Sequence, residues 1–477
     1  MGQFSYLAGE AVLAISALAL LMVGVFAGKR SVSIVRYGSI IALLIFAFAG
    51  YVFNDQGTAF GGAFIADSFG HYVKTLLGLT AAAALWFSRS YFQREKLDQF
   101  EYSILLLFAV LGMGTMVSSG NLLSLYIGLE LQSLALYVMA TFNRDSLRSS
   151  EAGLKYFVLG ALSSGLLLYG MSLIYGFTGS IAYDGIAQYL SGHEHVSGGV
   201  VAGLVFMLSG LAFKISAAPF HMWTPDVYEG APTPVTGFFA GAPKLAALAL
   251  ITRLVTGPFG GIEQSWQQVL VALAVLSMLV GAFGALTQTN IKRLMAYSSI
   301  ANMGYALVAL SAGGQAGVNG MLIFMSIYLV TIVGTFACIL QMRTRDGMVE
   351  NISDLGGLSK DNLPLAIIFS ALMFSVAGIP FFVGFFGKWF AFAPAFGSGL
   401  AWLVVVALLA SVVGAFYYLR IIKTIWFDDQ VQSFVKAPPS LAVLSSVSAL
   451  LLFPVLLLPF VASPVLALIE RAASSLF

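Results

Sequence analysis

Long runs of apolar residues, separated by short polar stretches, extend along the whole chain. A helix needs about 20 apolar residues to cross the hydrocarbon core of a bilayer. Runs of about this length predict fourteen membrane-spanning helices, and therefore an all-α polytopic membrane protein. The predicted spans lie near 10–28, 34–53, 71–88, 103–118, 120–141, 152–177, 198–223, 234–256, 266–287, 294–310, 317–342, 363–392, 399–419 and 440–461. The fourth and fifth are separated only by a short polar stretch at 118–121.

Two of these spans have an unusual pattern. Segments 198–223 and 363–392 carry Pro219 and Pro380 inside long apolar runs, and the second is too long for one untilted crossing. We therefore expect a broken helix in each. Proline-interrupted spans at matching places in two halves indicate internal repeats, with a binding or conduction site at the break. Two unrelated proline kinks are the alternative.

Composition supports the membrane assignment and excludes several classes of function. Charged residues make up 9% of the 477 residues, against roughly 25% in a soluble domain, and hydrophobic residues make up 59%. The net charge is +2 and the basic residues are dispersed, so nothing indicates nucleic-acid binding. The single cysteine, Cys338, excludes an internal disulfide and a multi-cysteine metal or iron–sulfur site.

The basic residues predict the orientation of the chain in the membrane. Most of them fall in loops that follow odd-numbered spans, and almost none in loops that follow even-numbered ones. The odd loops hold Lys29, Arg30, Arg36, Arg89, Arg94, Lys96, Arg144, Arg148, Lys292, Arg293, Arg343, Arg345, Lys360, Arg420, Lys423 and Lys436. By the positive-inside rule these loops are cytoplasmic, and both termini lie on the non-cytoplasmic, periplasmic side.

Four of the charged residues that fall within predicted spans stand out, because they are not explained by closeness to a basic loop. Glu130, Lys214, Lys244 and Lys388 are each surrounded in sequence by apolar residues. Ionisable residues are rare in membranes, usually face the bundle interior or a water-filled cavity, and mark ion or proton pathways. A structural ion pair, for instance Glu130 with Lys214, is the simpler interpretation. It does not account for three lysines, because one glutamate cannot neutralise them all.

Other basic residues lie nearer the ends of spans. Lys155 is close to the start of its span. Its side chain could extend to the membrane interface, and this explains its position as well as a functional role does. Lys74 and Arg253 also lie near span ends, and we interpret them as interfacial anchors.

The longest polar stretch tied to the buried spans is rich in turn-forming residues. From His221 to Thr236 it reads His-Met-Trp-Thr-Pro-Asp-Val-Tyr-Glu-Gly-Ala-Pro-Thr-Pro-Val-Thr, which predicts a rigid turn. With Tyr-Ile-Gly-Leu-Glu130-Leu-Gln-Ser-Leu and Gly-Ile-Pro380-Phe-Phe-Val-Gly-Phe-Phe-Gly-Lys388, it resembles the subunit N family of bacterial NADH:quinone oxidoreductase, respiratory complex I. The sister subunits L and M and the multisubunit cation/proton antiporters share only the His-x-Trp-x-Pro-Asp core of this stretch.

The resemblance implies an architecture and a set of site residues. An N-terminal three-helix segment at 1–102 would precede two inverted five-helix repeats at 103–256 and 266–425, and a C-terminal helix would occupy 440–477. The resemblance assigns proton translocation to Glu130, its partner Lys214, the central Lys244 and the terminal Lys388. It adds Lys155 and the loop histidine His221, for which hydrogen bonding that fixes a turn is an equal alternative.

The resemblance also implies a setting. The chain would be a translocase subunit in the bacterial inner membrane, coupling electron transfer from NADH to quinone in other subunits to proton pumping. It would hold no cofactor or metal itself, because NADH, FMN, iron–sulfur clusters and quinone belong to partner subunits. Subunits M and K and the lateral helix of subunit L would be its neighbours, together with lipid. A stand-alone or Mrp-type cation/proton antiporter and a purely structural arm subunit are the alternative functions.

Overall fold

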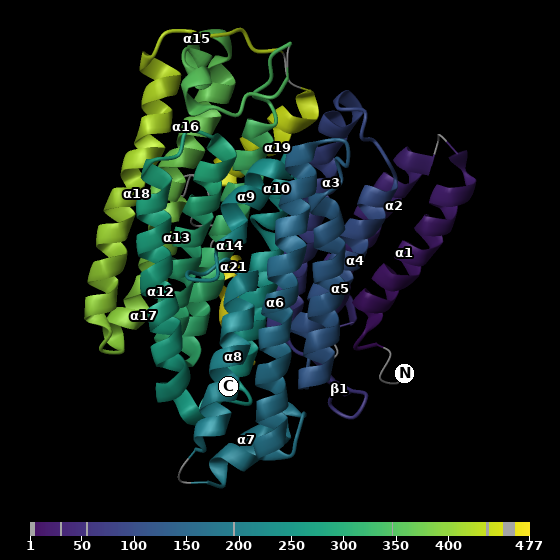
Figure 1. Ribbon diagram of the computed structural model, residues 1–477, viewed down its shortest axis with the longest axis vertical. Coiled ribbons are helices and arrows are strands. Elements are labelled where there is room, and N and C mark those ends of the chain that lie inside the picture. Colours follow the sequence, from purple (N-terminus) through teal and green to yellow (C-terminus); the bar gives the residue numbers. More distant parts are fainter. Residues whose placement is uncertain are drawn as a thin grey trace.

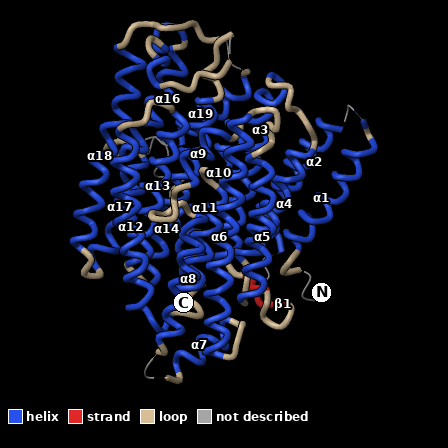
Figure 2. The backbone as a smooth tube through the Cα atoms, viewed as in Figure 1, coloured by secondary structure: helices blue, strands red, loops and turns tan. Residues whose placement is uncertain are grey.

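The computed structural model describes residues 5–28, 31–53, 56–193, 196–345, 347–435, 438–451 and 463–477. Long helices run side by side along one direction and form an elongated bundle (Figure 1). Figure 2 shows helix in nearly every part of the described chain, with strand confined to one small hairpin. In the described ranges, nine helices are long and apolar enough to span a membrane, and four shorter apolar helices accompany them. The all-helical membrane class is confirmed, whereas the count of fourteen stays a prediction.

The helices follow one another with short connections. In chain order they are α1 (Ala8–Phe26), α2 (Ser31–Phe53), α3 (Ser68–Arg94), α4 (Glu101–Val117), α5 (Leu122–Ala140), α6 (Leu147–Thr178), α7 (Tyr183–Ser191), α8 (Gly198–Lys214), α9 (Trp223–Gly230), α10 (Thr233–Phe239), α11 (Ala242–Thr256), α12 (Glu263–Leu286), α13 (Ile291–Ser311), α14 (Gly314–Ile339), α15 (Leu358–Asp361), α16 (Leu363–Ala377), α17 (Val383–Gly397), α18 (Ala401–Phe427), α19 (Pro439–Leu451) and α21 (Ser463–Ser474). The hairpin pairs β1 (Gly57–Ala59) with β2 (Phe64–Ala66) in antiparallel register.

Polar side chains at helix starts explain several of these boundaries. Asn121 accepts a hydrogen bond from the backbone N of Ser124 at the start of α5, and Asp67 does the same for Gly70 in α3. Such caps satisfy backbone donors that have no partner inside the helix. The predicted separation of the fourth and fifth spans is confirmed, since α4 ends at Val117 and α5 begins at Leu122. The last predicted span, 440–461, is described only as far as Leu451, and its remainder lies outside the described residues.

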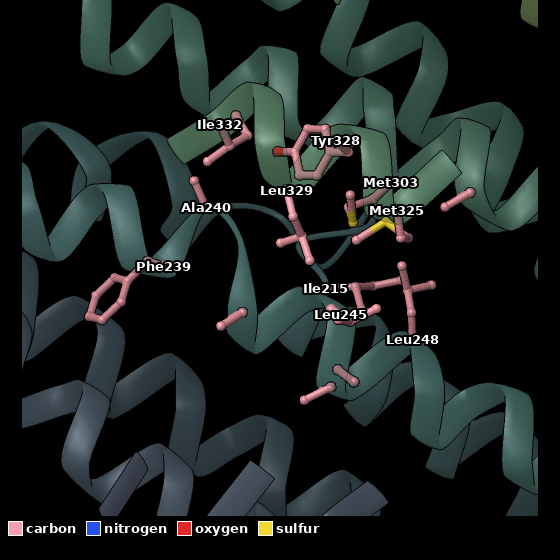
Figure 3. Close-up of a cluster of buried hydrophobic side chains, with 14 of the residues drawn as sticks. Ile215, Phe239, Ala240, Leu245, Leu248, Met303, Met325, Tyr328, Leu329 and Ile332 are labelled. Atoms are coloured by element: carbon pink, nitrogen blue, oxygen red, sulfur yellow. The ribbon is translucent and has the colours of Figure 1, made fainter. Parts of the chain in front are cut away.

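The centre of the bundle is α11, which is buried along nearly its whole length. Leu245 and Leu248 of this helix face Met303 of α13 and Met325 and Leu329 of α14 (Figure 3). A helix enclosed by other helices has no lipid contact, so a polar group on it meets only protein or enclosed water. Lys244 is on this helix.

Close backbone contacts hold α4 against α5, the helix that carries Glu130. A Cβ atom on Gly112 would lie 2.4 Å from the backbone N of Gln132, and one on Gly128 would lie 2.7 Å from that of Met116. Only glycine permits this approach, in the same way as small residues do at other membrane helix contacts. The position of Glu130 is therefore fixed by the packing of α5 on α4.

Both predicted helix breaks are confirmed. The first separates α8, which ends at Lys214, from α9, and the second separates α16, which ends at Ala377, from α17. Residues in left-handed backbone conformation occupy the two breaks: Ser216 has φ +63° and Gly378 has φ +84°. Non-helical backbone at membrane depth is tolerated only beside protein or enclosed water.

The rigid turn predicted after the first break is wrong in detail, because the segment folds into the short helices α9 and α10. Pro225 lies in the first turn of α9, and Pro234 at the start of α10. The first-turn N–H groups of a helix have no intrahelical acceptor, so proline is tolerated there. The prolines therefore set where these helices begin.

The interpretation of Lys74 and Arg253 as interfacial anchors is also wrong. Lys74 is buried and pairs with Glu10 of α1 at 2.6 Å, and Arg253 is buried and pairs with Asp67 at 2.8 Å. Hydropathy placed the start of the third span too late, since α3 begins at Ser68. The acidic partners Glu10 and Asp67 are far in sequence from Lys74 and Arg253, so hydropathy does not reveal the two pairs.

The two ends of the described chain lie at the same end of the bundle as the hairpin, opposite α15 (Figure 1). A Cβ atom on Gly57 of β1 would lie 2.8 Å from the hydroxyl of Tyr6. At the start of α3, the backbone N of Phe69 donates to the hydroxyl of Ser475 at 3.0 Å. This arrangement agrees with termini on one side, and which side is cytoplasmic stays a prediction.

Candidate functional site

The first buried lysine lies where α8 ends. Lys214 is 5% exposed, and its ammonium donates to the hydroxyls of Ser133 (2.8 Å) and Tyr137 (3.3 Å), both on α5. The ammonium also lies 5.7 Å from the centroid of the Tyr137 ring. These contacts supply hydroxyl acceptors and an aromatic face to a cation that has left water.

Glu130 lies one turn before Ser133 on α5 and is half-buried. Its carboxylate accepts a hydrogen bond from Ser164 of α6 at 2.5 Å. No direct ion pair joins it to Lys214 in the described structure, so the simple structural pair is not formed. Residues three apart on a helix share a face. Ser133, to which Lys214 donates, therefore lies on the same face of α5 as Glu130.

The second buried lysine, Lys244, is in the first turn of α11 and is completely buried. Its ammonium donates to Ser299 of α13 at 2.5 Å and lies 5.3 Å from the centroid of the Tyr228 ring. The Ser299 hydroxyl is also 2.7 Å from that of Tyr328 on α14. Lys244 is thus held by a hydroxyl group of α13 and an aromatic ring of α9, with no carboxylate among its described partners.

The third, Lys388 of α17, lies against the second break. Its ammonium donates to the carbonyl of Ala377, the last residue of α16, at 2.9 Å, and to Ser411 of α18 at 2.7 Å. Carbonyls at the end of a helix lack intrahelical donors and carry partial negative charge, so they suit a cation. The ring centroid of Tyr305 is 5.2 Å away.

One side of Lys388 adjoins an apolar groove of about 620 Å³ between the break and α18. Trp389, Phe396 and Leu408 line it, and all three are exposed on the outside of the chain. The surroundings of the two breaks therefore differ, because the first begins with buried residues at 215–218 whereas the second adjoins a groove on the outer surface.

Further hydroxyl groups line α13 beside the lysines. Ser298 lies 2.5 Å from the hydroxyl of Tyr418 on α18, and the Asn302 side chain donates to the Ser298 carbonyl. Sequence reasoning missed these residues and Ser299. The available signal was the polar spacing of Ser298, Ser299 and Asn302 in a helix that is buried along nearly its whole length.

Lys155 and His221 lie apart from the buried lysines. Lys155 is part-exposed and pairs with Glu151 and Asp226, each at 2.7 Å, so it belongs to a charged cluster at the edge of the bundle. His221 follows the first break and is half-buried, and its Nδ1 has no hydrogen-bond partner in the described structure. Neither side chain contacts Lys214, Lys244 or Lys388 there.

Arg293 completes the cluster around Asp226. Its guanidinium donates to Asp226 at 2.7 Å and to Glu229 at 3.0 Å. Burial alone would raise the pKa of Asp226, but hydrogen bonds from Lys155 and Arg293 outweigh it and hold that pKa below its usual value. A hollow of about 220 Å³ opens beside this cluster, and a neighbouring one of about 590 Å³ is lined by Glu350, which pairs with Lys292. Water can therefore reach this end of the bundle.

In the residues that the structure describes, no group of three histidine, cysteine, aspartate or glutamate side chains is close enough to hold a metal ion. Cys338 is buried as a free thiol. The chemistry that the arrangement offers is proton exchange between ammonium, hydroxyl and carboxylate groups.

Comparison with known proteins places this geometry in a family. Residues 119–414 match the family model described as NADH:quinone oxidoreductase/Mrp antiporter, TM. The chain is 55% identical over 459 residues to NADH-quinone oxidoreductase subunit N of Maricaulis maris, covering 95% of each chain. The chain belongs to the subunit N family. Subunit N 1 of Rhizobium meliloti is 51% identical and covers 98% of this chain and 97% of its own.

Three solved structures share the fold of this chain. A chain of respiratory complex I from Thermus thermophilus is 33% identical, with a TM-score of 0.82, and covers 96% of this chain and 99% of its own. A chain of an archaeal membrane-bound sulfane sulfur reductase is 25% identical, with a TM-score of 0.87. A chain of the Mrp complex from a Dietzia species has a TM-score of 0.87 at 21% identity, which shows the shared fold alone.

The family match also divides the candidate residues. Glu130, Lys214, Lys244 and Lys388 all lie within the matched residues, as do Lys155 and His221. The Glu10–Lys74 pair lies before them, in a part of the subunit N chain that the family model does not cover.

Proposed function

We propose that the chain is the proton-translocating N subunit of NADH:quinone oxidoreductase, working as a multi-pass protein of the bacterial inner membrane. One observation carries the proposal. Lys214, Lys244 and Lys388 are buried, and each donates to hydroxyl groups, while the described structure gives none of them a carboxylate partner. Such groups can exchange protons, whereas permanently paired charges are held in place.

Proton movement would start at the pair of Glu130 and Lys214. The carboxylate favours positive charge on Lys214, whose ammonium donates to Ser133 one turn along α5 from Glu130. If Glu130 is drawn away when a neighbouring subunit changes its charge, Lys214 loses this support and gives up its proton. Glu130 therefore acts as the controlling residue.

The proton would then pass to Lys244 and on to Lys388. Ser299 and Tyr328 stand beside Lys244, and Tyr305 and Ser411 beside Lys388, with enclosed water bridging the distances between them. Lys155 with its charged cluster would supply protons from the cytoplasmic side, and His221 would assist at the first break. The energy comes from NADH oxidation by quinone in partner subunits, which hold FMN, iron–sulfur clusters and quinone.

The same proposal includes two inverted five-helix repeats, at 103–256 and 266–425. They would follow the N-terminal three-helix segment at 1–102 and precede the C-terminal helix at 440–477. The breaks after Lys214 and after Ala377 support this division, because each ends an apolar helix beside a buried lysine. Both termini would face the periplasm, as the basic loops predict.

We place subunit K beside Glu130 and subunit M beside Lys388, with the lateral helix of subunit L along the row. Exposed apolar side chains on both outer faces support lipid or subunit contacts there. They include Leu123, Ile127 and Leu134 on α5, and Leu408, Val412 and Phe416 on α18.

The first test is co-purification. Membranes are extracted in mild detergent and run on a native gel. We expect the chain to migrate with NADH dehydrogenase activity in a large particle. Migration alone, or with small partners that lack this activity, would overturn the proposal and favour a cation/proton antiporter. Cation-dependent proton flux in liposomes would then be measured.

Replacing Glu130 with glutamine tests the controlling carboxylate. Glutamine keeps the shape and can still accept from Ser164, but it has no charge to support Lys214. We expect NADH-driven proton translocation in vesicles to fall several-fold, with the complex assembled normally, and Glu130→Asp to retain most of the activity. Loss of assembly in Glu130→Gln before any loss of pumping per complex would instead support a structural subunit.

A further inference from the structure

A second set of buried charges lies in the three helices before the family match. Glu10 of α1 and Lys74 of α3 form an ion pair at 2.6 Å, with side chains only 8% and 7% exposed. Removing two charges from water is costly, and replacing such a pair with apolar residues is often neutral or stabilising. Packing alone therefore does not account for the pair.

A histidine shares the space around this pair. His71 lies one turn before Lys74 on α3, and a Cβ atom on Gly50 would lie 2.5 Å from its ring, so that glycine makes room for the imidazole. Glu10, His71 and Lys74 together line one cavity of about 20 Å³, enough for a single water molecule. A carboxylate, an imidazole and an ammonium group are thus brought together around one water-sized space.

The cavity lies near one end of the bundle. Glu10 is in the first turn of α1, and Ser5 and Tyr6, which precede that helix, also line the cavity. The Lys74 ammonium is 4.8 Å from the centroid of the Phe64 ring in the hairpin. The cavity is therefore close to the aqueous phase at the hairpin end, far from the charged cluster around Lys155.

Two separate hydroxyl contacts join α14 to α3 and to the surroundings of Lys244. Tyr72, next to His71 in α3, has its hydroxyl 2.7 Å from that of Ser326 on α14. Two residues farther along α14, Tyr328 contacts Ser299, to which Lys244 donates. α14 therefore carries polar groups that face both the central lysine and the helix of His71.

The other charged and titratable groups near the cavity are Asp67, Arg253, Tyr51 and Tyr6. Asp67 and Arg253 form their own ion pair, and the ring of Tyr51 lies 6.4 Å from that of His71. Because both ion pairs are neutral overall, one added proton gives the cluster a single positive charge. Lys74 can keep that charge over the Phe64 ring while Glu10 is neutral.

We propose that Glu10, His71 and Lys74 form a second proton-binding site, outside the antiporter-type helices, which exchanges protons with the aqueous phase at the hairpin end. A proton arriving at the site binds the Glu10 carboxylate and separates it from Lys74. His71 relays the proton to water at the hairpin end, and the ion pair closes again. The origin of the protons rests on the function proposed above.

The test uses the assembled complex in liposomes and the double variant Glu10→Gln/Lys74→Met, which removes both charges with little change in shape. We expect normal assembly and NADH oxidation, with at least a twofold drop in protons released per NADH. The matched control is Arg36→Met/Asp98→Asn, which removes an ion pair at the opposite end of the same three helices. Its proton release is expected to equal that of the unaltered chain.

Normal proton release by the assembled double variant would overturn the proposal, as would an equal loss in the control. If the double variant does not assemble, His71→Gln decides, because it keeps the ion pair: reduced release supports the site and unchanged release overturns it. Lys244→Met separates the two proposals. Impaired pumping there with normal pumping in the double variant refutes only the second site, whereas normal pumping in Lys244→Met refutes the proposed function itself.

Discussion

Lys244→Met is expected to reduce NADH-driven proton translocation at least tenfold while leaving the complex assembled. Methionine fills most of the volume of the lysine side chain and can lie in the same enclosed position on α11. It cannot carry a proton, and the neighbouring side chains Ser299, Tyr228 and Tyr328 offer only hydroxyl groups. A tenfold loss corresponds to about 1.4 kcal/mol on the rate-limiting barrier, a modest demand for removing a proton carrier from a linear route.

Proton uptake by membrane vesicles, measured with a pH-sensitive dye and divided by the rate of NADH oxidation, checks this prediction. Lys244→Arg is the matched variant, since it keeps a positive charge but does not release its proton. We expect it to be as inactive as Lys244→Met. A Lys244→Met variant that assembles fully and pumps as many protons per NADH as the unaltered complex would refute the central role of Lys244.

Arg253→Ala is expected to have the largest effect on stability. Arg253 donates to both carboxylate oxygens of Asp67, and through Nε to the carbonyl of Val117 at the end of α4. It therefore joins α11 to the start of α3 and to the end of α4. Removing one partner of a buried pair leaves the other charge without compensation and costs about 3–5 kcal/mol.

The amount of folded subunit extracted from membranes, and its thermal unfolding in detergent, would measure this loss. The matched control is Arg253→Met/Asp67→Asn, which removes both charges together. It should be much less destabilised than the single variant, because no uncompensated charge stays buried. Equal destabilisation of the two would show that the arginine acts through its packing on Phe69 and its contact with Val117 rather than through the ion pair.

The sequence could reveal the charged site residues but not their partners. Glu130, Lys214, Lys244 and Lys388 stand out because a charge inside an apolar run is rare and costly. The hydroxyls that hold them do not, since serine and tyrosine are tolerated at many places in membrane helices. Ser299 lies 55 residues from Lys244 in the chain, and only the packing of α13 on α11 brings them together.

The helix breaks were predictable for a similar reason, because a proline in a long apolar run has few structural explanations. The errors arose where hydropathy was used to find the end of a helix. Lys74 lies only a few residues inside the predicted span 71–88, which favours an interfacial position, yet it is buried and its partner Glu10 is on another helix. Which residues pair across a bundle is decided by tertiary packing, and hydropathy contains no information on that.

The groove beside Lys388 affects how well the assembled complex can hold a proton gradient. Its walls are exposed apolar side chains of α17 and α18. In the isolated chain, one side of Lys388 is therefore open to the outer surface through the groove. In a membrane that maintains a proton gradient, protons that leaked through this groove would dissipate the gradient. With subunit M beside Lys388 as proposed above, the neighbour would complete the electrical insulation of the terminal lysine, and an isolated subunit in liposomes should be leakier than the complex.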